Sequence, residues 1–206
     1  TQNMVDAFFM ANGRSIDDPL SSYQSSGYST FQAPLDDQAR SIYNPWVGRE
    51  PRFYVNITYH NSLWLNTQNG KIYTDFTYHG NSGHYQTAND YSRTGYVVRK
   101  AMGFGKWDFN NRTLTLLRLA EVYLNYAECL NESDPGNADI LKYLNLIRVR
   151  AGIPTYGSSG LPAPASQDEM RTALRKERRV ELAFENNRFF DVRRWKIAEQ
   201  TDNGPM

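Results

Sequence analysis

The stretch that most constrains this fold reads SQDEMRTALRKERRVELAFENNRFFDVRRW and runs from Ser166 to Trp195. Ser166 followed by Glu169 has the spacing of a capping box, in which each residue satisfies a free backbone amide of the first helical turn. Apolar residues then recur at roughly helical spacing as far as Phe184. This pattern predicts a helix that begins at Ser166 and lies with one side on a core.

The polar side of this helix carries three glutamates spaced four apart, at Glu177, Glu181 and Glu185. They would lie in one stripe and repel each other unless cations are supplied. We expect the chain to turn after Asn187 and to form a second short helix over about 188–198, so that its arginines reach the stripe. The structural ion-pair hub predicted in this way comprises Glu177, Glu181, Arg188, Asp191 and Arg194.

Three stretches resemble one protein family. The segments ERRVELAFENNRFFDVRRW, RLAEVYLNYAECLN and TQNMVDAFFMANGRSI are similar to sequences of SusD/RagB-like proteins. The resemblance implies a surface-exposed outer-membrane lipoprotein that captures glycan or peptide fragments for a SusC-like TonB-dependent transporter. It also implies that the ion-pair hub is scaffold, that no catalysis or cofactor is involved, and that this is a C-terminal portion without the helical-repeat half.

Composition excludes some classes of partner. The net charge is +1, so nothing favours nucleic acid or an anionic membrane surface. Cys129 is the single cysteine, which excludes an intrachain disulfide, and its apolar helical context predicts a buried side chain. No stretch approaches the ~20 apolar residues that a membrane span requires.

Residues 1–112 are predicted to form a loop-rich region with short strands and hairpins. The Asn-Gly pairs at 12–13 and 69–70 are strong hairpin signals. Alternating apolar and polar residues predict a strand over 53–60, and a further short strand is expected over 94–100. The remaining expectations are a short helix at most around 36–43 and a long loop over 77–93, rich in Gly, Asn, His and Tyr.

Residues 113–206 are predicted to be helical. One helix is expected over 113–131, and the next should begin with Asp134 as its cap and Pro135 in the first turn. Gly152 should end that second helix. Together the two regions predict a single α+β domain, mostly α-helical, with short hairpins and long loops.

Candidate catalytic and metal sites are weak. Glu121 and Glu128 lie seven apart, about 10 Å along a helix, which is unsuited to a glycosidase pair flanking one bond. They are better explained as a polar stripe pairing with Arg118. His79, His84 and Asp90 offer a remote metal alternative, but none of the histidines lies in a zinc motif. We therefore expect that the chain is not an enzyme and binds no metal.

Aromatic faces remain as the means of binding, because a sugar ring presents CH groups to a flat ring and hydroxyls to polar groups at its edge. The predicted ligand-binding residues are Trp46, Asn61, Trp64, Tyr85, Arg93 and Trp107. The alternative is that the tryptophans only cover the sheet or pack on the long helix. We expect non-catalytic binding of an extracellular oligosaccharide, with transporter docking or peptide binding as the alternatives.

Overall fold

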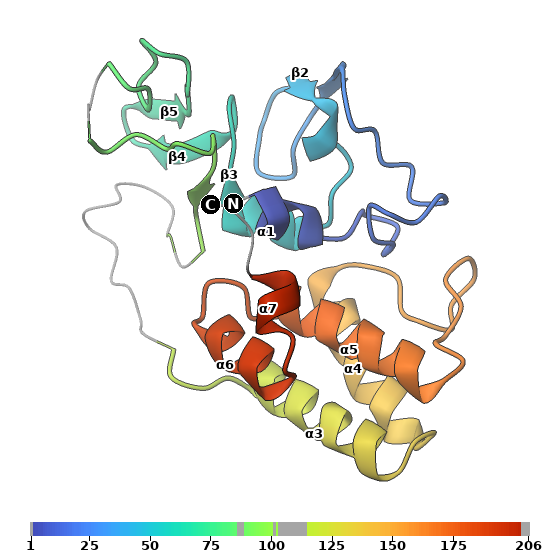
Figure 1. Cartoon of the computed structure of the whole chain (residues 1–206). Helices are drawn as coiled ribbons and strands as arrows, with labels where there is room; N and C mark the ends of the chain where they lie inside the picture. Colours follow the sequence, from blue (N-terminus) through green and yellow to red (C-terminus); the bar gives the residue numbers. More distant parts are fainter. Residues whose placement is uncertain (1, 86–88, 101, 103–114, 203–206) are drawn as a thin grey trace. The chain divides into compact units, whose positions relative to one another are not determined.

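The computed structural model describes residues 2–85, 89–100, 102 and 115–202 (Figure 1). They belong to two compact units, unit 1 over Thr1–Leu114 and unit 2 over Thr115–Met206, which are described separately. Helices and short strands with long connections confirm the predicted α+β class, whereas the grouping into a single domain stays a prediction. The elements of unit 1 are α1 (Gln2–Ala7), β1 (Tyr28–Phe31), β2 (Arg40–Tyr43), η1 (Asn44–Trp46), α2 (Pro51–Asn56), β3 (Ile57–Thr58), β4 (Leu63–Thr67), β5 (Gly70–Tyr73) and β6 (Val97–Val98).

A buried arginine and a buried glutamate tie the first residues of unit 1 to α2. Arg49 donates hydrogen bonds to the carbonyls of Val5 (2.6 Å) and Phe8 (2.7 Å), in the last turn of α1 and just after it. Glu50 is fully buried and accepts from the backbone N–H of Phe9 at 2.9 Å and from Arg52 at 2.7 Å. These bonds fix the segment that precedes α2.

The strand predicted over 53–60 is wrong for most of its length. Pro51 occupies the first turn of α2, where its fixed φ and missing N–H are tolerated. Phe53 and Ile57 lie four apart, so the same apolar residues suit one side of a helical turn. Only Ile57–Thr58 is extended, paired antiparallel with β6, and this confirms a short strand within 94–100.

The short helix expected around 36–43 is also wrong, because 40–43 is a strand. β2 pairs antiparallel with β1, with Tyr28 opposite Tyr43 and Phe31 opposite Arg40. Arg40 is held by Asp36, whose carboxylate accepts from its Nε at 2.8 Å. The strand depends on a partner that lies earlier in the chain, which local residue spacing does not reveal.

The two Asn-Gly pairs have different outcomes. The pair at 69–70 connects β4 and β5 as predicted, with Gly70 at a φ of 114° that favours glycine. The pair at 12–13 forms a turn closed by a bond from Met10 N–H to the Arg14 carbonyl at 2.8 Å. Its flanks form no hairpin strands, since Met10 instead makes an isolated bridge with Arg49.

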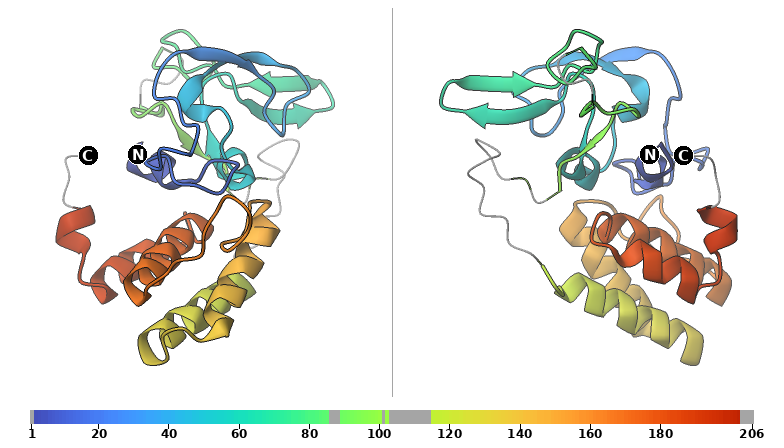
Figure 2. Two further views of the ribbon diagram at one scale, coloured as in Figure 1. Left: turned by 90° about the vertical axis from the view of Figure 1, so that its right-hand side faces the viewer. Right: turned by 60° about the vertical axis from the view of Figure 1, so that its left-hand side comes forward.

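Unit 2 contains five helices in its described residues: α3 (Leu119–Ser133), α4 (Ala138–Ala151), α5 (Gln167–Glu181), α6 (Asn187–Arg194) and α7 (Ala198–Thr201). The views of Figure 2 show α3 and α4 side by side with α5 packed near them. Their shared core comprises Leu124, Ala127, Ile140, Leu144, Ile147, Ala173, Leu174 and Leu182. None of the described helices is long and apolar enough to cross a membrane.

Several predicted boundaries in unit 2 require correction. The expected helix over 113–131 begins only at Leu119 in the described part of the chain. Asp134 ends α3, whereas the side chain of Asn137 caps α4 by accepting from Asp139 N–H. The intervening Gly136 has a φ of 92°, so the chain reverses before the second helix starts. Gly152, at a φ of 75°, ends α4 as predicted.

Cys129 is exposed, so its predicted burial is wrong. Leu124 and Ala127 face the core of unit 2, and a residue two positions after Ala127 lies on nearly the opposite side of a helix with 3.6 residues per turn. The apolar residues of α3 extend beyond its buried side. Leu119, the first residue of α3, is one of these exposed apolar residues.

The predicted start of α5 is confirmed with one adjustment. The hydroxyl of Ser166 accepts from the backbone N–H of Glu169 at 3.2 Å. The Glu169 carboxylate accepts from Ala165 N–H at 2.7 Å, one residue before the expected partner. Both bonds stabilise the first turn, whose free N–H groups need partners.

The glutamate stripe of α5 is neutralised mainly from elsewhere in unit 2. Glu177 pairs with Arg148 of α4 at 2.9 Å, and both side chains are 0% exposed. Glu181 binds Arg118, from the segment before α3, and Arg150, from α4. These cations neutralise Glu177 and Glu181 without the arginines of the following helix, which were predicted to do so.

The arginines that follow the break have other partners. Arg194 binds Glu128 of α3 and Asp191, and Asp191 in turn accepts from Arg178 at 2.7 Å. Arg188 donates instead to Thr201 (2.9 Å) and Asp202 (3.0 Å), so its predicted place in the ion-pair hub requires correction. The second helix ends at Arg194, and α7 is a separate short helix whose C-terminal side Arg188 contacts.

Candidate functional site

The loop that follows β5 is braced by its own side chains. Asp75 accepts from the backbone N–H and the hydroxyl of Thr77 at 2.9 and 2.7 Å. Asn81 accepts from Asp75 N–H at 2.8 Å and donates to the Tyr73 carbonyl at 2.7 Å. Tyr85 N–H closes the loop by donating to the Tyr78 carbonyl at 2.9 Å. The loop therefore has a defined conformation although much of it is exposed.

Two glycines allow the loop to be this tight. A Cβ atom at Gly80 would collide with the backbone and carboxylate of Asp75. A Cβ atom at Gly83 would collide with the carbonyl oxygen of Thr77 and the backbone of Tyr78. Any larger residue must therefore open the loop.

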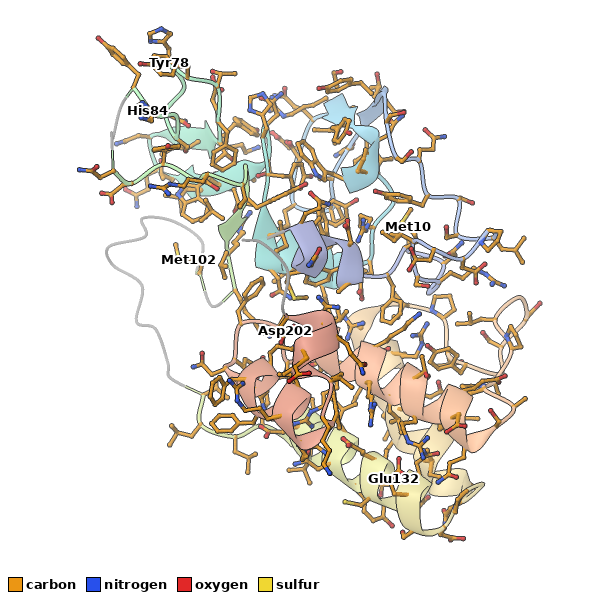
Figure 3. The ribbon with its side chains drawn as sticks, in the orientation of Figure 1. Met10, Tyr78, His84, Met102, Glu132 and Asp202 are labelled. Carbon is orange, nitrogen blue, oxygen red and sulfur yellow. The ribbon has the colours of Figure 1, made fainter. Side chains whose placement is uncertain are left out.

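The braced loop carries a group of contacting aromatic rings. We call Tyr78, His79, His84, Tyr85 and Tyr91 the ring cluster. Tyr78 stacks on His84 with centroids 5.6 Å apart and an interplanar angle of 15°, and the two lie next to each other in Figure 3. The His79 and Tyr85 rings are 4.7 Å apart, and the His84 and Tyr91 rings 4.5 Å. Tyr78 is 58% exposed and Tyr85 64%, so ring faces are open to a ligand.

Polar groups lie at the base of the loop. The backbone N–H of Phe76 donates to His60 Nδ1 at 3.2 Å, which places the proton of neutral His60 on Nε2. Hydrogen bonds from Thr77 lower the pKa of Asp75 below its ordinary value, so its carboxylate is ionised at neutral pH. Asn61 is exposed with a φ of 66°, and its N–H donates to the Thr74 carbonyl. Such groups can accept or donate hydrogen bonds at the edge of a ligand.

The other predicted residues lie in different settings. Trp46 is half-buried and its indole N–H donates to the Tyr96 hydroxyl at 3.0 Å, while its ring lies 4.8 Å from that of Tyr59. This setting agrees with the alternative of a structural tryptophan. Arg93 is exposed. Trp107 lies outside the described residues.

Trp64 occupies an irregular position in β4. The register of the hairpin shifts between Leu63 and Leu65, so Trp64 lies at a β-bulge and has no residue opposite it. Bulges redirect side chains and are frequent near functional sites. Trp64 is half-buried and, within the described ranges, stacks on no other ring.

The sequence-based prediction therefore included one member of the ring cluster, Tyr85, and missed the other four. The available signal was the density of Tyr and His in the loop over 77–93. Histidines 79 and 84 were considered as metal ligands with Asp90, but no group of three such residues in the described part of the chain could hold a metal ion. In this structure His84 stacks on Tyr78, and the His79 ring makes a tilted contact with that of Tyr85.

Glu128 of α3 lacks the properties of a glycosidase acid. It accepts from both Nη atoms of Arg194 and from the Trp195 indole N–H at 2.7 Å. Burial raises its pKa, but the hydrogen bonds from Arg194 and Trp195 outweigh burial and hold the pKa below its ordinary value. A general acid needs the opposite shift.

An exposed set of braced rings beside amide and carboxylate groups has the composition of a ligand-binding surface. The model of the SusD family matches residues 1–206, and the chain belongs to this family. The SusD-like protein P2 of Formosa agariphila is 39% identical over 90 residues, which are 41% of this chain and 17% of that protein. The resemblance noted in the sequence is thereby confirmed.

Solved structures of SusD-like proteins are similar to this chain in fold. A SusD-like protein from Bacteroides fragilis NCTC 9343 has a TM-score of 0.70 at 33% identity, covering 96% of this chain and 36% of that one. A SusD-like carbohydrate binding protein from the same strain has a TM-score of 0.64 at 23% identity, covering 98% and 36%. The chain thus spans about a third of the length of these structures and aligns with less than a quarter of its curated relatives.

Proposed function

We propose that this chain binds an extracellular oligosaccharide through the ring cluster, without catalysis, as part of a surface system that feeds a SusC-like TonB-dependent transporter. The observation that carries the proposal is the ring cluster itself, with Tyr78 and Tyr85 exposed on a loop that hydrogen bonds hold in place. Family membership supports it. The location we infer is the outer face of the outer membrane, where a lipid anchor holds the protein.

The chemistry of the loop suits a neutral sugar chain. The faces of Tyr78 and Tyr85 offer apolar area to the CH groups of a pyranose. Asn61 and Asp75 offer polar atoms near the base of the same loop. Each neutral hydrogen bond contributes only about 0.5–1.5 kcal/mol net, and association costs several kcal/mol. Several ring contacts are therefore required, which favours an oligosaccharide over a single sugar.

The test is a glycan-array screen of the 206-residue chain, followed by calorimetry with the best oligosaccharide. We expect Tyr85→Ala and Tyr78→Ala each to weaken binding by about tenfold, as the loss of ~1.4 kcal/mol of ring contact would. Tyr28→Ala is the matched control, because Tyr28 is a tyrosine of unit 1 outside the ring cluster that is at least as exposed as Tyr78 and Tyr85. Equal affinity in the wild type and both ring-cluster variants would overturn the proposal.

Docking on the transporter is the second candidate, and exposed apolar residues of unit 2 favour it. Leu119 and Val122 of α3 and Phe189 and Phe190 of α6 are all exposed. If docking is the main role, Phe190→Ser would reduce co-purification of the transporter while glycan binding stays unchanged. Peptide binding is the remaining alternative, and a peptide library that competes with the oligosaccharide for Tyr85 would favour it.

A further inference from the structure

We propose that unit 1 contains a second ligand site, a pocket that takes one neutral sugar ring. We call it the turn pocket. Its volume is about 300 Å³, and it is lined by Met10, Ala11, Asn12, Ser21, Ser22, Gln24, Ser29, Asn44, Val47 and Gly48. Ligand pockets usually measure ~300–1,000 Å³, so the turn pocket is large enough for a single ring. It shares no residue with the ring cluster.

The walls of the turn pocket are fixed before any ligand arrives. Asn12 donates to the carbonyls of Leu20 (3.0 Å) and Ser21 (3.2 Å), and its Oδ1 accepts from Arg14 N–H. On the other side, Asn44 donates to the Ser26 carbonyl at 2.8 Å.

The Asn44 amide is engaged at its oxygen as well, which accepts from the hydroxyl of Ser29 at 2.6 Å. A Cβ atom at Gly27 would come within 2.9 Å of Asn44 Nδ2, so this amide is also closely packed. A site with walls held in this way loses little conformational entropy on binding.

The composition of the lining indicates the class of ligand. All ten lining residues are uncharged, so the pocket offers no counter-ion to an acidic or basic ligand. Met10 is buried and forms an apolar surface together with Val47. Ser22 and Gln24 are exposed at the rim, and their side chains make no hydrogen bond within the described part of unit 1. Apolar surface with free hydroxyl and amide groups at its edge suits a ring that has one CH face and a margin of hydroxyls.

The choice of a sugar among neutral polar ligands rests on the proposed function. The geometry alone defines a small, uncharged molecule with one apolar face. If the ring cluster holds an oligosaccharide, a site for one ring on the same unit would bind a released or terminal sugar. The two sites are separable, because their residues are different and each can be altered alone.

The test is a titration of the 206-residue chain with methyl glycosides of neutral hexoses and N-acetylhexosamines, observed through the methionine ε-methyl signals. Met10 is labelled in Figure 3. Its Cε lies 3.7 Å from the position that a Cβ atom would take at Gly48, and both residues line the pocket. We expect one glycoside to shift the Met10 signal saturably and to leave Met4 and Met170 unmoved. No shift of Met10 up to roughly 0.1 M, above the millimolar affinity expected for a single ring, would overturn the proposal.

Two variants and two matched controls make the test specific. Gln24→Ala should weaken the glycoside by about two- to tenfold, the loss of one neutral hydrogen bond, and Gln68→Ala at the exposed β4–β5 turn should not. Ala11→Leu should abolish the Met10 response by filling the pocket from an exposed position, whereas the exposed Ala39→Leu should preserve it. A response unchanged in Ala11→Leu would place the sugar elsewhere.

Tyr85→Ala separates this inference from the proposed function. It should weaken oligosaccharide binding by about tenfold and preserve the Met10 response to the glycoside. If the wild-type chain binds the oligosaccharide through Tyr85 but shows no Met10 response to any glycoside, the turn pocket alone is overturned. A preserved Met10 response with no oligosaccharide binding overturns the proposed function and leaves the turn pocket standing.

Discussion

At the scale of single residues, the loss of one partner from a buried arginine–carboxylate pair lowers the free energy of unfolding strongly. Arg148 and Glu177 are both 0% exposed, and Arg148 also donates to the Pro154 carbonyl at 2.8 Å. Its guanidinium lies 4.1 Å from the centre of the Tyr156 ring. Such a pair contributes little net stability compared with apolar residues, but removing one partner leaves an uncompensated buried charge.

Arg148→Ala should therefore lower the free energy of unfolding by about 3–5 kcal/mol. Urea unfolding of the 206-residue chain, followed by circular dichroism, measures this change. Arg171→Ala is the control, because Arg171 binds Glu132 at the surface of the same unit and exposed ion pairs contribute little. Similar losses for the two variants would show that burial of the pair does not determine its effect.

Glu128 makes stability depend on pH in a predictable direction. Its pKa in the folded chain lies below its ordinary value of 4.5, because hydrogen bonds from Arg194 and Trp195 outweigh the opposing effect of burial. The unfolded chain therefore takes up the proton first as the pH falls. The stabilisation by Glu128 is fully present above about pH 4.5 and is lost as the pH falls through the folded pKa.

Glu128→Gln should be less stable than the wild type near neutral pH and should lose less stability on acidification. Thermal melting at pH values of about 7, 5 and 3.5 measures both effects. The control is Glu121→Gln on the same helix, since Glu121 makes none of these bonds. Parallel pH profiles for wild type and Glu128→Gln would contradict the assignment.

At the scale of elements, local rules predicted the structures that local residues determine. Ser166 with Glu169, Gly152 and the Asn69-Gly70 turn act within a few residues of themselves, and each was recognised. The helix α2 was missed because Phe53 and Ile57 suit a strand face and a helix face equally. The strand β2 was missed because its partner β1 ends nine residues before it, at Phe31.

The braced loop is the element on which the proposed site depends. Gly83→Ala places a Cβ atom against the Thr77 carbonyl oxygen and the backbone of Tyr78, so the loop must open and the ring contacts must separate. We expect oligosaccharide affinity to fall by more than tenfold with little change in thermal stability, because exposed loops contribute little to the core. Calorimetry and thermal melting measure the two quantities.

Gly70→Ala is the control for this loop. Gly70 has no neighbour within 4 Å of an added Cβ atom, but its φ of 114° strains any other residue. It therefore perturbs a turn of unit 1 away from the ring cluster, and we expect affinity to stay within about twofold of the wild type. Equal losses in Gly70→Ala and Gly83→Ala would mean that general strain in unit 1, rather than the ring cluster, controls binding.

At the scale of the whole molecule, the motifs of the sequence were sufficient to recognise the family, and the family model confirms it across residues 1–206. The binding surface was less predictable. A loop rich in Tyr and His could be identified, and Tyr85 was among the candidates, but the stacking of Tyr78 on His84 depends on how Asp75 and Asn81 close the loop. Those bonds join residues up to eight apart in an irregular segment, for which no periodic pattern exists.

The most direct measurement is backbone amide shift mapping of the 206-residue chain with the oligosaccharide that the array identifies. We predict that the perturbed amides lie between Asp75 and Tyr91, with the largest changes beside Tyr78 and Tyr85. Amides of α3 and α5 in unit 2 should not move. Perturbations confined to the surroundings of Trp46, or to unit 2, would contradict the assignment of the ring cluster as the glycan site.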